Sequence, residues 1–139
     1  MLYPAKFTID PDDGGYVVTF RDIPEAITQG DTIQEATEMA EDALTVSMDF
    51  YFEDNRPVPM PSQAEEGEHL IGLPLSVWSK VLLLNTMLEQ HISQTELAKR
   101  LHKPKQEVQR IVDLNHSTKI DTVIDALKAL GKQPQLSIN

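Results

Sequence analysis

The feature that most constrains the fold is a window near the C-terminus, from Ser93 to Asp113, with the sequence SQTELAKRLHKPKQEVQRIVD. It contains two segments of helical length with apolar or small residues at helical spacing, and His102-Lys103-Pro104 forms a tight break between them. Proline suits the first position of a helix because its φ is already fixed and it has no N–H to lose. A second helix can therefore start at Pro104, and Ala98 is small enough to let two steeply crossing helices approach closely. The window predicts a helix-turn-helix.

The second predicted helix carries the side chains of a DNA-reading helix. Its apolar positions face inward, and its outward positions hold lysine, glutamine and arginine, which reach phosphates and base edges. The residues predicted to contact DNA from this helix are Lys105, Gln106, Gln109 and Arg110. The residues predicted to hold phosphates are Gln94, Thr95, Lys103 and Lys119. An ordinary helical hairpin with a solvated basic face is the alternative.

Composition restricts the class of protein. The 139 residues allow one or two small domains, and the absence of cysteine excludes disulfides, thiolate chemistry and cysteine-based zinc sites. The N-terminal segment lacks a basic region followed by an apolar run, so we expect no signal peptide. The longest apolar stretch, Val81 to Leu84, is far too short to span a membrane. We therefore expect a soluble, cytoplasmic protein with no membrane partner.

The net charge of −10 is distributed very unevenly along the chain. Residues 1–70 contain 16 acidic and 3 basic side chains, whereas residues 71–139 contain 6 acidic and 9 basic side chains. An acidic half repels phosphate and attracts a basic partner, while a mildly basic half tolerates the DNA backbone. The asymmetry predicts two modules with opposite electrostatic roles, although an acidic surface that only maintains solubility is the alternative for the first half alone.

The first half has the pattern of a small sheet. Residues 5–9 alternate in polarity, residues 10–15 are rich in turn formers, and residues 16–20 are β-branched and aromatic. These three pieces predict a β-hairpin. Residues 26–29 are long enough for a further short strand, and residues 69–73 for a fourth that closes the sheet.

Helical spacing predicts the remaining elements. A first helix follows Asp31, its expected N-cap, and continues to about Phe52. A helix from Pro74 to Glu89 has an apolar surface too broad for one partner, so we expect it to connect the modules or to lie within a dimer. The other predicted elements are a loop over residues 56–67, a last helix from Lys119 to Leu130 with Thr118 as N-cap, and a terminal strand within residues 133–138.

A spaced pattern of aromatic, glycine and acidic residues extends over the N-terminal region. It consists of Tyr3-Pro4, Phe7, Asp10, Asp12, Gly14-Gly15-Tyr16, Phe20 to Pro24, Thr28 to Thr32 and Glu35-Ala36. This pattern resembles the HicB antitoxin family, and the rest of the chain resembles the HicB subtype with a helix-turn-helix. There are two departures. His102 replaces the glycine common at a turn position that favours positive φ, and Glu25 stands where many relatives have glycine.

The resemblance implies both a fold and a function. It implies an N-terminal domain like a truncated ribonuclease H fold, which blocks HicA, a small basic mRNA-cleaving toxin. It also implies a C-terminal module that binds the operator of its own operon, in a homodimer or higher oligomer. We accordingly expect an α+β protein with a toxin-neutralising domain over residues 1–72 and a DNA-binding and dimerisation domain over residues 73–139. The carboxylates predicted to meet the toxin are Asp10, Asp12, Asp22 and Asp31.

A nuclease is the strongest rival hypothesis. Enzymes of the ribonuclease H type hold two divalent metals with clustered carboxylates, which here could come from Asp10, Asp12, Asp13, Asp22 and Asp31. The first three lie in a turn, where aspartate is favoured as a turn former, and no other strand or helix in residues 1–70 offers an evident partner carboxylate that faces the same place. We therefore expect no enzyme activity and no catalytic residue.

A one-component transcriptional regulator with a ligand-sensing N-terminal domain is the second alternative. The sequence shows no glycine-rich phosphate loop and no compact cluster of ligand-type residues. Its four histidines have no metal-ligand spacing. They are His69, His91, His102 and His116. We expect neither a metal nor a cofactor.

Overall fold

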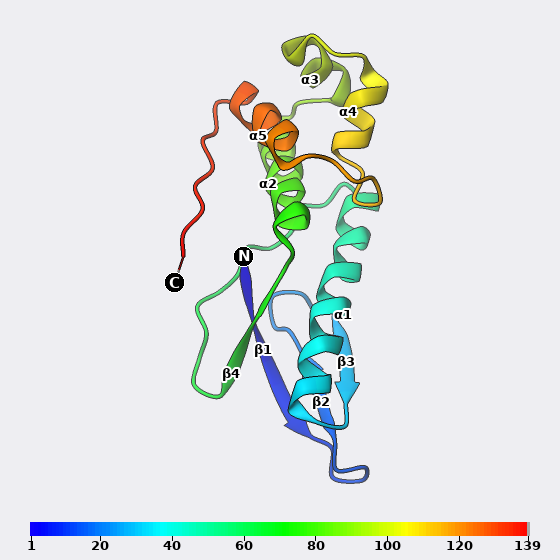
Figure 1. The fold of residues 1–139 in the computed structure, drawn as a ribbon, viewed down its shortest axis with the longest axis vertical. Helices are drawn as coiled ribbons and strands as arrows, with labels where there is room; N and C mark the ends of the chain where they lie inside the picture. Colours follow the sequence, from blue (N-terminus) through cyan, green and yellow to red (C-terminus); the bar gives the residue numbers. More distant parts are fainter. Residues whose placement is uncertain (139) are drawn as a thin grey trace. The chain divides into compact units, whose positions relative to one another are not determined.

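The computed structural model describes residues 1–138, and the chain divides into two compact units (Figure 1). The sheet unit consists of Met1–Phe50 and Val58–Pro74, and the helical unit consists of Tyr51–Pro57 together with the chain from Leu75 onward. The fold is α+β, as predicted. The assignment of separate functions to residues 1–72 and 73–139 stays a prediction.

The sheet unit contains a four-stranded antiparallel sheet in the order β3-β2-β1-β4. Its strands are β1 (Leu2–Ile9), β2 (Tyr16–Thr19), β3 (Ile27–Gly30) and β4 (Glu68–Gly72). The predicted hairpin and both further strands are confirmed. The likeness to a truncated ribonuclease H fold stays an implication of the family resemblance.

The turn of the hairpin is held by Asp10. Its Oδ1 accepts a hydrogen bond of 2.9 Å from the backbone N–H of Asp12, and the Asp10 N–H donates to the carbonyl of Gly15 at 2.7 Å. Gly14 has a φ of 75°, a conformation in which a side chain would be strained. Local turn chemistry therefore joins β1 to β2, as the sequence of residues 10–15 predicts.

The core of the sheet unit lies where the long helix α1 (Ile33–Glu53) meets the sheet. A Cβ atom at Gly30 would lie 2.5 Å from the backbone nitrogen of Ala36, so glycine is required for the close approach of β3 to α1. Buried apolar side chains from the strands and from one stripe of α1 form this core. They include Tyr3, Ala5, Val18, Ile71, Ala36, Ala40, Leu44 and Met48.

The start of α1 corrects one expectation. Thr32 is the capping residue, because its Oγ1 accepts a hydrogen bond of 3.1 Å from the N–H of Glu35, and its carbonyl accepts one of 2.8 Å from Ala36. The prediction that Asp31 caps this helix is wrong. Both residues are good caps by type, and the cap is the residue directly before the first helical residue, Ile33.

The described part of the helical unit, which ends at residue 138, contains four helices that share one apolar core. They are α2 (Leu75–Gln90), α3 (Gln94–Leu101), α4 (Lys105–Ile111) and α5 (Ile120–Ala129). Helix α2 packs against α5, and α3 packs against both α4 and α5. The buried core residues of this unit include Leu83, Met87, Leu97, Val108, Ile111, Val123, Leu127 and Leu130.

The turn between α3 and α4 forms where the sequence predicts it. His102 has a φ of 55° and a ψ of 42°, which is the left-handed conformation expected at this position. The backbone N–H of Lys103 donates to the carbonyl of Ala98 at 3.0 Å, which closes the C-terminal end of α3. Pro104 is the extended residue before the helix, and α4 begins one residue later than predicted, at Lys105. The classification of this pair as a DNA-binding helix-turn-helix stays a prediction.

Two expectations for the C-terminal region are wrong. Thr118 does not cap α5: the cap position is Lys119, which makes no side-chain capping hydrogen bond, and Thr118 Oγ1 donates instead to the carbonyl of Arg110 at 3.4 Å. Residues 133–138 form no strand, since the sheet unit's strands pair only with one another. No helix among the described residues combines the length and apolar character needed to cross a membrane.

Candidate functional site

The outward face of α4 matches the sequence prediction. Val108 and Ile111 are only 0% and 3% exposed and anchor the helix in the core. The predicted contact residues on the opposite side are exposed to solvent. They are Lys105, Gln106, Gln109 and Arg110. This helix therefore presents four long polar side chains, two of them cationic, without disturbing its packing.

Three of the predicted cationic residues line one open hollow of 190 Å³. Lys103 comes from the turn before α4, Arg110 from the last turn of α4, and Lys119 from the residue before α5. Three hydroxyl-bearing residues line the same hollow, namely Ser117, Thr118 and Thr122. Three cations and three hydroxyl groups suit an anionic group such as a phosphate.

An acidic residue also lines this hollow. The carboxylate of Glu107 lies 4.0 Å from the Nζ atom of Lys103, and both side chains are substantially exposed. Such an exposed pair contributes little to stability. It lowers the positive charge at one edge of the hollow, so the Lys103 ammonium is less available to an anion than the Arg110 guanidinium and the Lys119 ammonium.

The two predicted phosphate contacts at the start of α3, Gln94 and Thr95, do not line this hollow. Gln94 is half-buried and lines a separate cavity of 320 Å³, together with apolar residues such as Leu84 and Met87. Thr95 is exposed. The Oγ atom of Ser93 accepts a hydrogen bond of 3.1 Å from the N–H of Glu96, so this amide is already used by the helix cap. The structure thus brings Lys103, Arg110 and Lys119 together and leaves Gln94 outside their hollow.

A buried cation near this hollow was missed by the sequence prediction. Lys80 in α2 is 3% exposed, and its Nζ atom donates hydrogen bonds to the carbonyls of Arg110, Asp113 and His116 at 3.3, 2.7 and 2.6 Å. Burial lowers the pKa of Lys80 below its usual value of 10.5, and the nearby carboxylate of Asp113 opposes that shift. The available signal was that Lys80 is the one basic residue of α2, a helix in which apolar residues predominate.

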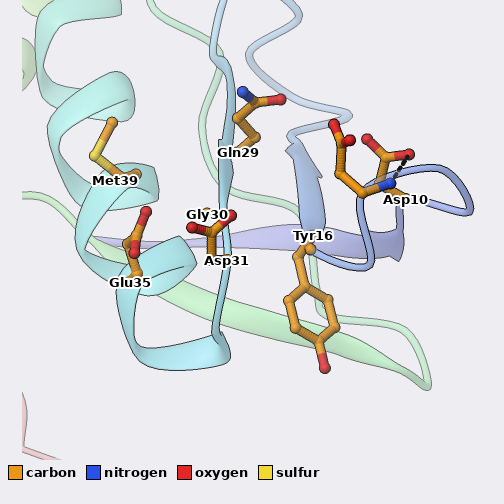
Figure 2. A pocket seen from close by; sticks show the side chains of 9 residues that line it. Asp10, Tyr16, Gln29, Gly30, Asp31, Glu35 and Met39 are labelled. Atoms are coloured by element: carbon orange, nitrogen blue, oxygen red, sulfur yellow. Dashed lines mark hydrogen bonds between the residues drawn. The ribbon is translucent and has the colours of Figure 1, made fainter.

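A second candidate site is an acidic pocket of 330 Å³ in the sheet unit. Figure 2 shows Glu35 and Met39 on α1 at one side, Asp10 on the hairpin turn at the other, and Asp31 between them. Asp13 also lines the pocket. The antiparallel pairing of β2 with β3 places Tyr16 opposite Gly30, and this register brings the hairpin turn next to the start of α1.

Only two of the four carboxylates predicted to meet a toxin share this pocket. They are Asp10 and Asp31, and Asp12 is not among the residues that line it. The carboxylate of Asp22 instead accepts hydrogen bonds from the backbone N–H of Ser62 at 2.8 Å and from the Ser62 hydroxyl at 2.5 Å. The sequence prediction missed Glu35 as a member of this pocket, although its position in the first turn after Asp31 was a usable signal.

The acidic residues do not form a metal site. Among the described residues, no group of three or more histidine, aspartate or glutamate side chains could hold a metal ion. The Asp10 carboxylate is already used by the hairpin turn, where it accepts from the N–H of Asp12. The pocket is therefore an acidic surface feature that suits a cationic group.

Comparisons with known proteins give consistent matches over the full chain. A family model described as the HicB-like antitoxin of bacterial toxin–antitoxin systems matches residues 2–82. The chain is 56% identical over 136 residues to "Antitoxin HicB" of Escherichia coli, with 98% of each chain covered. It is 54% identical over 136 residues to "Antitoxin HicB 2" of Photorhabdus laumondii, covering 98% of this chain and 95% of that protein. It is 34% identical over 139 residues to "Antitoxin HicB" of Pseudomonas fluorescens, covering 99% of this chain and 95% of that protein.

Proposed function

This chain belongs to the HicB antitoxin family, and from that membership we propose that its sheet unit blocks a basic, HicA-like ribonuclease toxin while its helical unit binds operator DNA. The protein is an antitoxin of a toxin–antitoxin system, so it pairs with a toxin. Neutralisation by direct coverage of the toxin and repression of its own operon are the finer parts of the proposal. Both would take place in the cytoplasm and by binding alone, without catalysis.

The acidic pocket is the observation that carries the toxin-binding half. Its carboxylates come from the hairpin turn, the end of β3 and the first turn of α1. Helix α1 continues the same charge, since its six charged residues are all acidic. Clustered negative charge accelerates association with a basic partner.

Tight binding also needs apolar anchors, because exposed charges mainly set association rate and salt dependence. Helix α1 supplies them beside the pocket. Met39, which lines the pocket, is 42% exposed, and Val46 and Phe50 are 62% and 48% exposed. Spacings of seven and four residues place these three side chains along one side of the helix. A basic protein surface with an apolar centre would complement this face.

The hollow beside α4 supports the DNA-binding half. Lys105, Gln106 and Gln109 are free to meet base edges, while the hollow formed with Lys103, Arg110 and Lys119 can take a phosphate. One such helix reads only a few base pairs. We therefore propose a homodimer or higher oligomer whose two helices, about 34–36 Å apart, read an inverted repeat.

Operator binding is tested with single substitutions in the full chain. Arg110→Ala should weaken binding to the DNA upstream of its own gene by about 1–3 kcal/mol, measured by fluorescence anisotropy. Lys128→Ala is the matched control, since this exposed lysine lies on α5 away from the hollow. Equal affinities for wild type, Arg110→Ala and Lys105→Ala would contradict the assignment.

Toxin binding is tested by neutralising the pocket. The double variant Asp31→Asn/Glu35→Gln should slow association with the toxin encoded beside this gene and reduce the salt dependence of the rate. Thr32 caps α1 in this chain, so the start of the helix is retained. Glu65→Gln/Glu66→Gln removes the same charge from an exposed loop of the sheet unit and is the control. If both double variants associate as fast as wild type, the pocket is not part of the toxin interface.

A further inference from the structure

Lys80 connects three backbone segments of the helical unit through one ammonium group. Its three N–H bonds match three acceptors, the carbonyls of Arg110, Asp113 and His116. The side chain is 3% exposed, so solvent does not replace these partners. A buried cation is costly unless hydrogen bonds compensate it, and here every donor of the ammonium is used.

The three carbonyls belong to the end of α4 and to the loop that follows it. The last carbonyls of a helix have no partner within the helix and carry partial negative charge. Arg110 lies in the last turn of α4, and its carbonyl accepts from Lys80 as well as from the N–H of Asp113 at 3.2 Å. Lys80 belongs to α2, so the positive charge that stabilises the C-terminal end of α4 comes from a different helix.

The same ammonium fixes the loop that completes the hollow. The carbonyl of His116 accepts from Lys80, and Ser117, Thr118 and Lys119 follow directly in the chain. Thr118 Oγ1 also donates to the carbonyl of Arg110 at 3.4 Å, which links this loop to α4 a second time. The Lys80 ammonium thus binds both the loop and the last turn of α4.

We infer that Lys80 is a positioning residue for the proposed DNA site, and that it holds the loop between α4 and α5 so that Lys119 and Arg110 face one phosphate. The inference rests on the proposed operator binding. Lys80 itself is too buried to reach DNA, so it acts through Lys119. Its removal should therefore matter much less once Lys119 is absent.

A double-mutant cycle with operator DNA tests this coupling. Lys80→Met keeps an unbranched side chain only one atom shorter and removes its charge and donors. It should weaken operator binding by roughly tenfold in the wild-type background and by less than about threefold in the Lys119→Ala background. Lys128→Met is the control, an identical change at an exposed lysine of the same unit, and should have no effect. Equal losses in both backgrounds, or no loss, would overturn the inference.

Two further measurements distinguish failure of the role inferred for Lys80 from failure of the proposed operator binding. Amide hydrogen exchange at residues 113–119 should be faster in Lys80→Met than in Lys128→Met, and unchanged exchange would overturn the inference whatever happens to DNA binding. A wild-type protein that binds no operator would refute the proposed function, while this exchange measurement still decides the role of Lys80. If Lys80→Met fails to fold, reductive methylation of the wild type decides instead. Lys80 should stay unmodified while Lys128 reacts, and equal modification would refute the burial on which the argument depends.

Discussion

Each unit of this protein contains loops that are held by charged side chains, and the clearest examples in the two units have charges of opposite sign. In the sheet unit, carboxylates accept hydrogen bonds: Asp10 from the N–H of Asp12, and Asp22 from Ser62. In the helical unit, the ammonium of Lys80 donates hydrogen bonds to three carbonyls. The first arrangement satisfies exposed amides of turns, and the second satisfies carbonyls at the end of a helix.

The contrast shows that the charge of a residue does not reveal whether it serves the fold or a partner. In the sheet unit, the carboxylates of Asp22 and Glu68 are engaged by other parts of the same unit. Within the described residues, no hydrogen bond or ion pair engages the side chains of Asp31 or Glu35, which line the acidic pocket. The many carboxylates of the first half of the chain thus separate into those that support the fold and those that remain open to a partner.

The largest expected effect is the destabilisation caused by core substitutions, which tests whether each unit can lose its binding activity while the other unit retains its own. Leu97→Ala in the helical unit and Leu44→Ala in the sheet unit each remove a fully buried side chain and should cost about 2–5 kcal/mol of unfolding free energy. Leu97→Ala should weaken operator binding while toxin binding is retained, and Leu44→Ala should do the reverse. Urea titration followed by both binding assays measures this. If each variant loses both activities at the same urea concentration, the units unfold as one, and the comparison fails.

A smaller effect is expected at Asp22, which the sequence assigns to the toxin interface. Because its carboxylate binds Ser62 by two hydrogen bonds, Asp22→Ala should lower the unfolding free energy by about 1–3 kcal/mol. The association rate with the toxin should fall no more than in Asp12→Ala, an equal loss of charge in the exposed hairpin turn. Stopped-flow association and urea unfolding give the two quantities. A slower association with unchanged stability would contradict this structural role and would support Asp22 as a toxin contact.

The smallest expected effect is the loss of stability at low pH that comes from the Arg21–Glu68 ion pair. Arg21 donates to both carboxylate oxygens of Glu68, each at 3.0 Å, and this lowers the pKa of Glu68 below its usual value of 4.5. The folded state therefore gains stability above that value and loses it as pH falls through the lowered pKa. The stability difference between wild type and Glu68→Gln should be present near neutral pH and should shrink as the pH falls below 4.5 and through the lowered pKa. Glu66→Gln should show no such change, and a pH-independent difference for Glu68→Gln would contradict the assigned cause.

Local chemistry determined most of the secondary structure, and the sequence was sufficient to predict it. Alternation of polarity predicted the hairpin, and helical spacing predicted each helix to within a few residues. The left-handed conformation of His102 agrees with the family resemblance, in which glycine is common at this turn position. Such signals depend on residues close together in the chain. The outward face of α4 was predictable from such a local signal, since helical periodicity alone separates Val108 and Ile111 from the exposed residues.

Tertiary structure decided which polar groups meet. Asp22 and Ser62 are 40 residues apart, and Lys80 and His116 are 36 residues apart, so neither pairing has a local signal. The choice of Thr32 over Asp31 as cap likewise depends on where packing of β3 lets the helix begin. Burial makes an unsatisfied polar group expensive, and only the folded chain determines which groups become buried together. The sequence by itself therefore determined most of the elements and the division of charge, while packing decided which charges support the fold and which remain for a partner.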